Sequence, residues 1–315
     1  MNPGNDPPPA GSGRQAPSGQ QFEISWGEHR ATVVEVGGGL RDCKLDGEEV
    51  LDGYGRAERC TGARGLPLIP WPNRLEDGAY DFDGTGYQVP LTEPDARNAI
   101  HGFLRWRNWA CRRHAAAQVV MGTVLHPQMG YPFTLDVSVT YTLDNAGLTV
   151  RTDATNTGDT ACPYGAGQHP YLSPGTGLID TCRLELDAAR WLPTDDRGLP
   201  ASDAGVAGSP YDFRAGREIG DQDINFTFTG LARDPAGRAW VRLSAPGGRR
   251  VALWAGEDYP FIEIYTAHTQ PAPHWRTGLG VEPMTCAPNA FRTGNGLIRL
   301  EPGQSAAASW GLRSW

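Results

Sequence analysis

Residues 134–155 alternate between apolar and polar side chains, and this pattern constrains the fold more than any other feature of the chain. In TLDVSVTYTL (134–143) every second residue is apolar, which is typical of a strand buried on one face. The turn residues DNAG (144–147) follow, and LTVRTDAT (148–155) alternates again, so the segment is predicted to form a β-hairpin. The predicted buried positions of its first strand are Leu135, Val137, Val139, Tyr141 and Leu143.

The same alternation recurs along the chain, between segments rich in turn residues. The 41 glycines and 26 prolines favour many turns and short strands over long helices, and only residues 57–66 are predicted to form a short helix. Because there is no repeat of fixed period and no long internal linker, we interpret residues 21–315 as a single all-β domain, a large antiparallel β-sandwich. The other predicted strands are residues 29–36, 117–125, 179–187, 238–245, 249–255, 259–267 and 296–303.

Composition excludes several classes of partner. Residues 1–20 are rich in Pro, Gly and Ser and have no apolar run, so they are predicted to be a disordered tail and not a secretory signal. Six widely spaced cysteines without a Cys-x-x-Cys pair predict reduced, mostly buried thiols in a cytoplasmic protein. The net charge of -8 argues against a nucleic-acid partner, and no apolar run approaches the roughly 18 residues of a membrane span. The oligomeric state, monomer or dimer, stays open.

Motifs for nucleotide and metal chemistry are incomplete. The segments GAGQHP (165–170) and GLGVEP (278–283) begin as Gly-x-Gly but have proline where a third glycine would be needed. The seven histidines are scattered and form no His-Glu-x-x-His motif. The sequence therefore predicts neither a metal site nor a bound cofactor.

Glu282 is the only charged residue of TGLGVEPMTCAPNAF (277–291). An ionised carboxylate in an apolar run loses hydration, which costs free energy unless a charged partner or a functional role compensates for it. His169 in YGAGQHPYL (164–172) shares one feature with Glu282, since a proline follows each of them. A residue before proline favours extended dihedral angles, and proline cannot donate to a β-ladder. Both side chains are therefore predicted to project from strands that end or leave the sheet.

Five short motifs, ordinary when taken singly, together resemble those of the aldose 1-epimerase (galactose mutarotase) family. The resemblance extends over about residues 22–315, and its first, third and last motifs are the most specific. The sequences of the motifs are similar to those of a bacterial branch of that family. In chain order the motifs are Asn73-Arg74-Leu75, His101-Gly102, His169-Pro170-Tyr171, Asp223 with Phe226, and Glu282-Pro283 with Asn289-Ala290.

The resemblance implies a galactose mutarotase-like supersandwich whose concave face binds a free aldose, such as glucose or galactose. It implies that Glu282 is the general base and that His169 is the general acid. No cofactor or metal takes part in the family's reaction. The residues implied to hold the sugar are Asn73, Arg74, His101 and Asp223.

The chemistry of anomer exchange agrees with these two roles. The sugar must lose the O1 proton and gain a proton on the ring oxygen, and each positioned proton transfer contributes about 10²–10⁴-fold in rate. The ordinary pKa values of Glu and His are about 4.3 and 6.5. A site that is active at neutral pH therefore raises the pKa of His169, or it works with a minority protonation state.

Two differences from the family's motif sequences affect which sugar the site is expected to bind. Phe103 follows His101-Gly102 where many members have a second glycine, and Met284 follows Glu282-Pro283. A sugar-phosphate 1-epimerase stays open, because Arg276 and Arg292 could bind a phosphate. A glycoside hydrolase would use two carboxylates, Glu282 and Asp223. A non-catalytic sugar-binding domain on the same fold is the alternative from another class.

Overall fold

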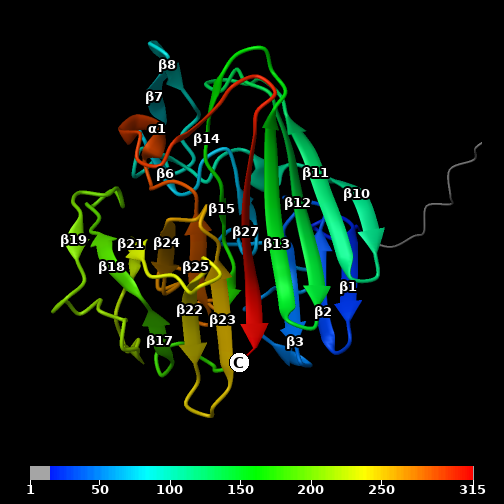
Figure 1. The fold of residues 1–315 in the computed structure, drawn as a ribbon, viewed down its shortest axis with the longest axis vertical. Helices are drawn as coiled ribbons and strands as arrows, with labels where there is room; N and C mark the ends of the chain where they lie inside the picture. The colour runs from blue at the N-terminus through cyan, green and yellow to red at the C-terminus, as the bar shows by residue number, and fades with distance from the viewer. Residues whose placement is uncertain (1–14, 315) are drawn as a thin grey trace, which may run out of the picture.

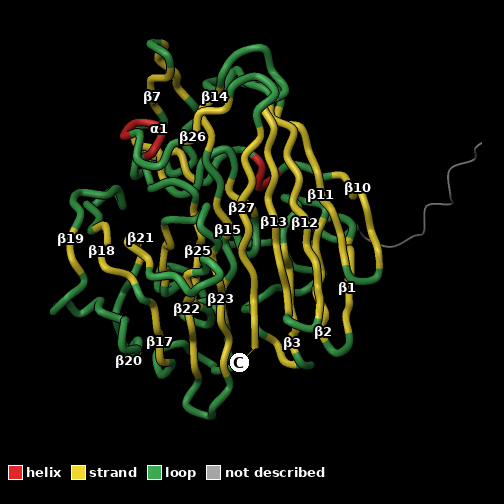
Figure 2. Tube along the Cα trace, in the orientation of Figure 1, coloured by secondary structure: helices red, strands yellow, loops and turns green. Residues whose placement is uncertain are grey.

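Antiparallel strands make up nearly all of the regular structure in the computed structural model, which describes residues 15–314 (Figures 1 and 2). This confirms the predicted all-β class. The described residues contain one short α-helix, α1 (Ala290–Thr293), and one 3-10 turn, η1 (Leu104–Trp106). The helix predicted at residues 57–66 is wrong, because these residues form turns. Gly62 and Gly65 have φ angles of +58° and +67°, a region that suits glycine and ends a helix.

The predicted hairpin forms part of a nine-stranded antiparallel sheet (Figure 1). Its two strands pair from Leu135 with Asn156 to Asp144 with Gly147, and the five predicted apolar side chains are all buried. In spatial order the sheet consists of β10 (Ala110–Ala115), β11 (Gln118–Leu125), β12 (Leu135–Asp144), β13 (Gly147–Asn156), β27 (Ser305–Ser314), β23 (Arg250–Ala255), β22 (Ala239–Ser244), β17 (Arg183–Leu186) and β20 (Arg217–Glu218).

A second large sheet packs behind the strands β22, β23 and β27 and carries the site described below (Figure 1). Its order is β19 (Ala204–Gly205), β18 (Ala188–Leu192), β21 (Asn225–Leu231), β24 (Phe261–Tyr265), β25 (Leu279–Met284), β15 (Gly167–Gln168) and β5 (Pro67–Leu68), with β16 (Tyr171–Leu172) also paired to β25. A four-stranded sheet contains β1 (Gln21–Trp26), β2 (His29–Val34), β3 (Leu40–Leu45) and β4 (Glu48–Glu49). Three strand pairs complete the fold: β14 (Cys162–Tyr164) with β26 (Ile298–Leu300), β6 (Arg74–Glu76) with β9 (Asn98–Ile100), and β7 (Ala79–Phe82) with β8 (Thr85–Gln88).

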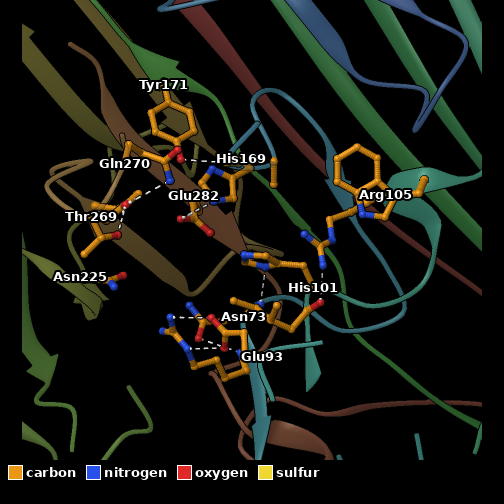
Figure 3. Close-up of a pocket in the computed structure, with 16 residues that line it drawn as sticks. Asn73, Glu93, His101, Arg105, His169, Tyr171, Asn225, Thr269, Gln270 and Glu282 are labelled. Atoms are coloured by element: carbon orange, nitrogen blue, oxygen red, sulfur yellow. Dashed lines mark hydrogen bonds and ion pairs between the residues drawn. The ribbon is translucent and has the colours of Figure 1, made fainter. Parts of the chain in front are cut away.

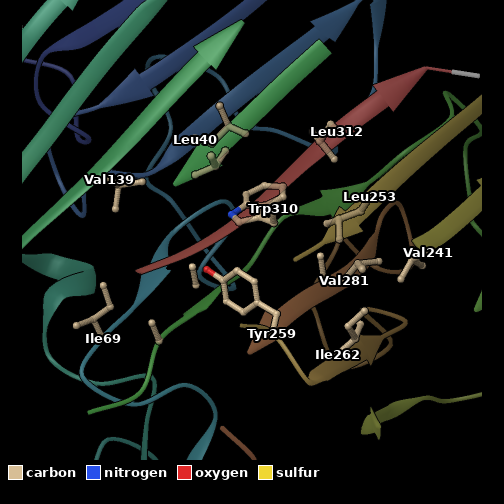
Figure 4. Packing of buried hydrophobic residues seen from close by; sticks show 14 of the residues in the cluster. Leu40, Ile69, Val139, Val241, Leu253, Tyr259, Ile262, Val281, Trp310 and Leu312 are labelled. Atoms are coloured by element: carbon tan, nitrogen blue, oxygen red, sulfur yellow. The ribbon is translucent and has the colours of Figure 1, made fainter. Parts of the chain in front are cut away.

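One hydrophobic cluster joins the sheets (Figure 4). Val241 and Leu253 of the nine-stranded sheet face Ile262 and Val281 of the second sheet, and Trp310 of β27 packs beside them. Burial of this apolar surface, at roughly 25 cal/mol per Å², is the main force that holds the two layers together. It also makes the second sheet a rigid support for the side chains on its other face.

Residues 15–20, the last part of the predicted disordered tail, have a defined place in the structure. Residues 16–20 lie against the end of β2, where the Val36 and Glu35 N–H groups donate to the carbonyl oxygens of Ser18 and Gln20 at 3.0 Å each. Ser18 is buried. Residues 1–14 lie outside the described residues.

All six cysteines are free, and five of them are buried. Their burial agrees with the prediction of mostly buried thiols. Within residues 15–314, no helix has the length and apolar character needed to cross a bilayer.

Candidate active site

Glu282 lies inside β25, and its side chain is almost fully buried (Figure 3). The prediction that Glu282 projects from a strand that ends or leaves the sheet is therefore wrong. Glu282 pairs directly with Glu263 of the neighbouring β24, and Pro283 continues the strand. The sheet thus holds this carboxylate on a rigid element, and a second carboxylate lies directly across the ladder.

The pairing on the other edge of β25 explains both the proline and the position of His169. The Val281 N–H donates to the Pro170 carbonyl at 3.0 Å, and the Thr285 N–H donates to the Ala166 carbonyl at 2.8 Å. The proline between these two donors has no N–H, and at this point the partner strand is split into β15 and β16. His169 lies in the split, so the prediction that it leaves the sheet is confirmed.

His169 and Glu282 meet in the interior of the site (Figure 3). The distance from His169 Nε2 to Glu282 Oε1 is 3.2 Å, and the two residues are only 5% and 2% exposed. The Tyr171 ring stacks on the imidazole at 5.0 Å and fixes its plane. His169 Nδ1 and Glu282 Oε2 have no hydrogen-bond partner among the described residues. Buried polar atoms without partners are rare in folded proteins, and here they indicate a place where a ligand supplies the missing bonds.

Burial controls the protonation of this pair. Burial, followed by the charge of Glu263, raises the pKa of Glu282 well above its usual range, and Arg74 acts in the opposite direction. Burial, followed by the nearby Arg105 guanidinium, lowers the pKa of His169 to about 3. In the empty site at neutral pH, the one proton that the pair shares therefore lies on Glu282, and the imidazole is neutral.

A strained turn brings Asn73 and His101 to the same site. Both residues have positive φ angles, +53° and +62°, and each binds the other's backbone. The Asn73 N–H donates to His101 Nδ1 at 3.0 Å, and the His101 N–H donates to the Asn73 carbonyl at 2.9 Å. Gly102 is required after them, because a Cβ there would lie 2.0 Å from the Ile69 carbonyl oxygen. Such local strain is common at functional sites.

The hydrogen bond to His101 determines what its ring can do. Because Nδ1 accepts a hydrogen bond from a backbone N–H, Nε2 of the neutral ring carries the hydrogen and acts as a donor. Burial, followed by Arg105, lowers the pKa of His101 well below its usual range, so the ring is neutral. His101, His169 and Glu282 have potential metal-ligating atoms within 4.8 Å of one another. The protonated Nε2 of His101 suits a hydrogen-bond acceptor better than a metal ion, which needs an unprotonated nitrogen.

These residues line a cavity of about 250 Å³ (Figure 3). Of the six residues assigned from the sequence, the cavity contains five: Asn73, Arg74, His101, His169 and Glu282. Arg74 is held by Glu93, with Nε and Nη2 at 2.9 and 3.2 Å from the two carboxylate oxygens. The remaining lining residues are Gly62, Ala63, Glu93, Ile100, Arg105, Trp106, Tyr171, Asn225, Tyr265, Thr269 and Gln270.

The structure does not place Asp223 among the residues that line this cavity. The Asp223 side chain is 66% exposed and lies 3.2 Å from Arg276 Nη1. Asn225, two residues later at the start of β21, lines the cavity in its place. The glycoside hydrolase alternative loses its proposed pair of carboxylates for the same reason.

Sequence reasoning missed Asn225, Arg105 and Glu263. Asn225 lies within the motif DQDINFTF, so its two-residue offset from Asp223 was the available signal. Arg105 follows the His101-Gly102 motif closely but belongs to no motif itself. Glu263 lies in a strand that was predicted correctly, yet only strand pairing places it beside Glu282.

Comparison with known proteins identifies the family of the chain. The sequence model of the aldose 1-epimerase family matches residues 20–313. The protein named "Uncharacterized protein YihR" of Escherichia coli K12 is 33% identical over 288 residues, which are 91% of each chain. The galactose mutarotase of Sus scrofa is 25% identical over 287 residues, which are 82% of this chain and 77% of that protein.

Solved structures share the fold. A putative aldose 1-epimerase from Escherichia coli K12 superposes with a TM-score of 0.80 at 23% identity, over 94% of this chain and 99% of that one. A GalM/aldose epimerase homologue from C. elegans gives a TM-score of 0.84 at 20% identity, over 94% and 98% of the two chains. The family model covers nearly the whole chain, and the fold agrees with it. The chain therefore belongs to the aldose 1-epimerase family.

Proposed function

We propose that the protein is an aldose 1-epimerase that interconverts the α and β anomers of a free aldohexose such as glucose or galactose. The contact between the buried Glu282 and His169 carries the proposal. Each of these side chains has one polar atom without a partner among the described residues, at the wall of a cavity lined mainly by hydrogen-bonding groups. A carboxyl group and an imidazole so placed can exchange protons with O1 and O5 of a sugar ring.

Ring opening needs two proton transfers in opposite directions. The Glu282 carboxylate takes the proton of O1 while protonated His169 gives a proton to the ring oxygen. The C1–O5 bond then breaks, and C1=O1 forms. Rotation about C1–C2 presents the other carbonyl face, and the same transfers in reverse close the ring as the other anomer. The enzyme returns to its starting state, with one proton still shared by the pair.

The pKa shifts give the empty enzyme the protonation state of the open-chain complex. In that state the shared proton lies on Glu282 and not on His169. Binding of a cyclic sugar must therefore move the proton across the 3.2 Å contact before the ring opens. The sequence left two possibilities open, a raised pKa for His169 or catalysis through a minority protonation state. The lowered pKa of His169 favours the second.

The other groups of the cavity support binding of a polyhydroxylated ring. His101 Nε2, the Arg74 guanidinium and the amides of Asn73, Asn225 and Gln270 offer donors on different sides. The Trp106 ring is 54% exposed at the cavity wall. An exposed aromatic face beside hydrogen-bonding groups suits the C–H face of a pyranose.

Replacing Asn225 with alanine is expected to raise KM about threefold to tenfold with a smaller change in kcat, because one hydrogen bond contributes about 0.5–1.5 kcal/mol. Asp223→Asn is the matched control, since it changes an exposed group of the same motif outside the cavity. Steady-state kinetics on both variants check the assignment. A larger KM effect for Asp223→Asn would return Asp223 to the list of sugar ligands.

The function is tested by anomer exchange, followed by NMR on fresh α-glucose, α-galactose and a panel of other aldoses. Exchange well above the buffer rate, in enzyme dialysed against EDTA, is expected for at least one of them. Saturable sugar binding without faster exchange would instead support the non-catalytic alternative. Activity that is lost with EDTA and restored by a divalent metal would contradict the metal-free mechanism.

An aldose with an anionic group, such as a sugar phosphate, is the second candidate substrate. Arg276 and Arg292, which the sequence offered for this role, form ion pairs with carboxylates at 2.6 and 3.3 Å. Arg105 is different. It lines the cavity and donates from Nη2 to the Ile100 carbonyl, and its buried Nε has no partner among the described residues.

Replacing Arg105 with glutamine separates these two substrates. If the substrate carries an anion at this wall, kcat/KM for it is expected to fall at least about 30-fold, because a buried charge pair loses one partner. For a neutral aldose the change is expected to stay within about threefold. Competition kinetics with a neutral aldose and its 6-phosphate check both outcomes, and equal effects on both would remove Arg105 from substrate selection.

A further inference from the structure

The second carboxylate, Glu263, lies beside Glu282 of the proposed acid–base pair, on the neighbouring strand. Glu263 of β24 pairs with Glu282 of β25 on one side and with Thr227 of β21 on the other, so the three side chains form one row on the same face of the sheet. Directly opposed side chains in antiparallel strands have Cβ atoms about 5 Å apart. Glu263 is 2% exposed and is not part of the cavity lining, so it acts on the site only through the side chains next to it.

Two opposed carboxylates this deeply buried cannot both be ionised at low cost, so one holds a proton. The hydrogen bonds decide which one. The Thr227 hydroxyl donates to Glu263 Oε2, and the Asn73 side chain also hydrogen-bonds Glu263, which favours the charged form. Glu282 Oε2, by contrast, has no donor among the described residues. The charge is therefore best held on Glu263, and the proton on Glu282.

The charged groups around this row act in opposite directions, because Arg74 lowers the pKa of both carboxyl groups while the charge of Glu263 raises that of Glu282. Arg74 faces both carboxylates from β6, but its guanidinium is bound by Glu93. His169 faces Glu282 from the split between β15 and β16 and is neutral. Burial raises the pKa of Glu263 to about 7, against the effects of Thr227 and Arg74, and the charge of Glu263 in turn raises the pKa of Glu282.

We propose that Glu263 is a positioning residue that retains the shared proton on the Glu282–His169 pair, and so sets the alkaline limit of catalysis without touching the sugar. The inference rests on the proposed function and deepens it. Only the pair with one proton can open and close the ring. Loss of that proton at high pH leaves Glu282 ionised and His169 neutral, with no acid for the ring oxygen. A negative charge one strand away opposes that loss.

The test is the pH dependence of kcat/KM for Glu263→Gln. Glutamine keeps the shape and can still accept the Thr227 hydroxyl, but it removes the charge. The alkaline limb is expected to move down by about two pH units, the size expected for a like charge about 5 Å away at an effective dielectric constant near 20. The exposed Glu218→Gln of β20 is the control and should leave the limb where it is. A purely structural role would lower kcat at every pH with the limb unmoved, and that result would overturn the proposal.

A second measurement does not depend on turnover, so it separates this inference from the proposed function. A carboxyl group whose pKa is raised by folding binds more protons in the folded state, so its contribution to stability is lost as pH rises through the folded pKa. For Glu263 that window runs from the ordinary glutamate value to about 7. The melting temperature of Glu263→Gln minus that of the wild type should therefore rise across this window. A difference that is constant with pH would overturn the proposal even if no aldose were turned over.

Discussion

Replacing Glu282 with glutamine is expected to lower kcat for anomer exchange by at least about 10²-fold, the low end of the contribution of one general base. Glutamine preserves the size of the side chain and its place opposite Glu263 in β25. It cannot accept the O1 proton, however, and it cannot return a proton when the ring closes. Both halves of the reaction are therefore blocked at the same residue.

Binding and stability provide the controls for Glu282→Gln. Sugar affinity should change little, because the amide still offers hydrogen bonds to O1. The amide resembles the protonated carboxyl group that burial favours, so the melting temperature near neutral pH should be held or raised. At higher pH the variant should be the more stable protein. The raised pKa of Glu282 contributes to wild-type stability only while the carboxyl group is protonated, and that contribution is lost as pH rises. Turnover near the wild-type rate would make Glu282 a structural residue.

The scaffold was predictable because alternation reports burial on one face directly. Leu135, Val137 and Val139 are fully buried in β12, and the turn falls at Asn145-Ala146 as the sequence indicated. The N-terminal and C-terminal strands β1 and β27 were missed. The small apolar residues of Ser305–Ser314 give a weak pattern, although this strand lies at the centre of the nine-stranded sheet.

Only those site residues that lie within short sequence motifs could be predicted. The motifs around His101, His169 and Glu282 lie far apart in sequence, yet the structure brings them to one cavity. The environment of Glu282 could not be read in the same way, because Glu263 is beside it only through the register of β24 and β25. Pairing register is a long-range property, so a single sequence cannot show that Glu282 has a second carboxyl group beside it.

Local rules also failed where tertiary pairing overrode them. A residue before proline was expected to leave the sheet, and this holds for His169 but not for Glu282. The difference lies in which edge the missing N–H faces. Pro283 faces the gap between β15 and β16, so no ladder bond is lost and β25 continues through Met284.

The two histidines of the site are expected to give different kinetic defects when each is replaced by asparagine. His169→Asn should lower kcat by about 10²–10⁴-fold, because the ring oxygen loses its proton donor. His101→Asn should raise KM at least as much as it lowers kcat, since a donor to a sugar oxygen acts in the ground state and the transition state alike. Asparagine is suitable at residue 101 because it tolerates the positive φ of +62° found there.

The pH dependence distinguishes the two histidines a second time. Protonation of buried His169 is disfavoured, with a pKa of about 3, so the wild-type acid limb should lie well below neutral pH. His101→Asn should keep that limb, because His101 holds no mobile proton. The residual activity of His169→Asn should lack the acid limb. In the wild type this limb reflects binding of a second proton to the pair, and the variant has no imidazole to bind it. Parallel profiles of kcat/KM for the wild type and both variants provide the measurement. If the two variants showed the same kcat, KM and acid limb, the donor of the ring proton would not be His169, and the division of roles inferred from the 3.2 Å contact with Glu282 would be wrong.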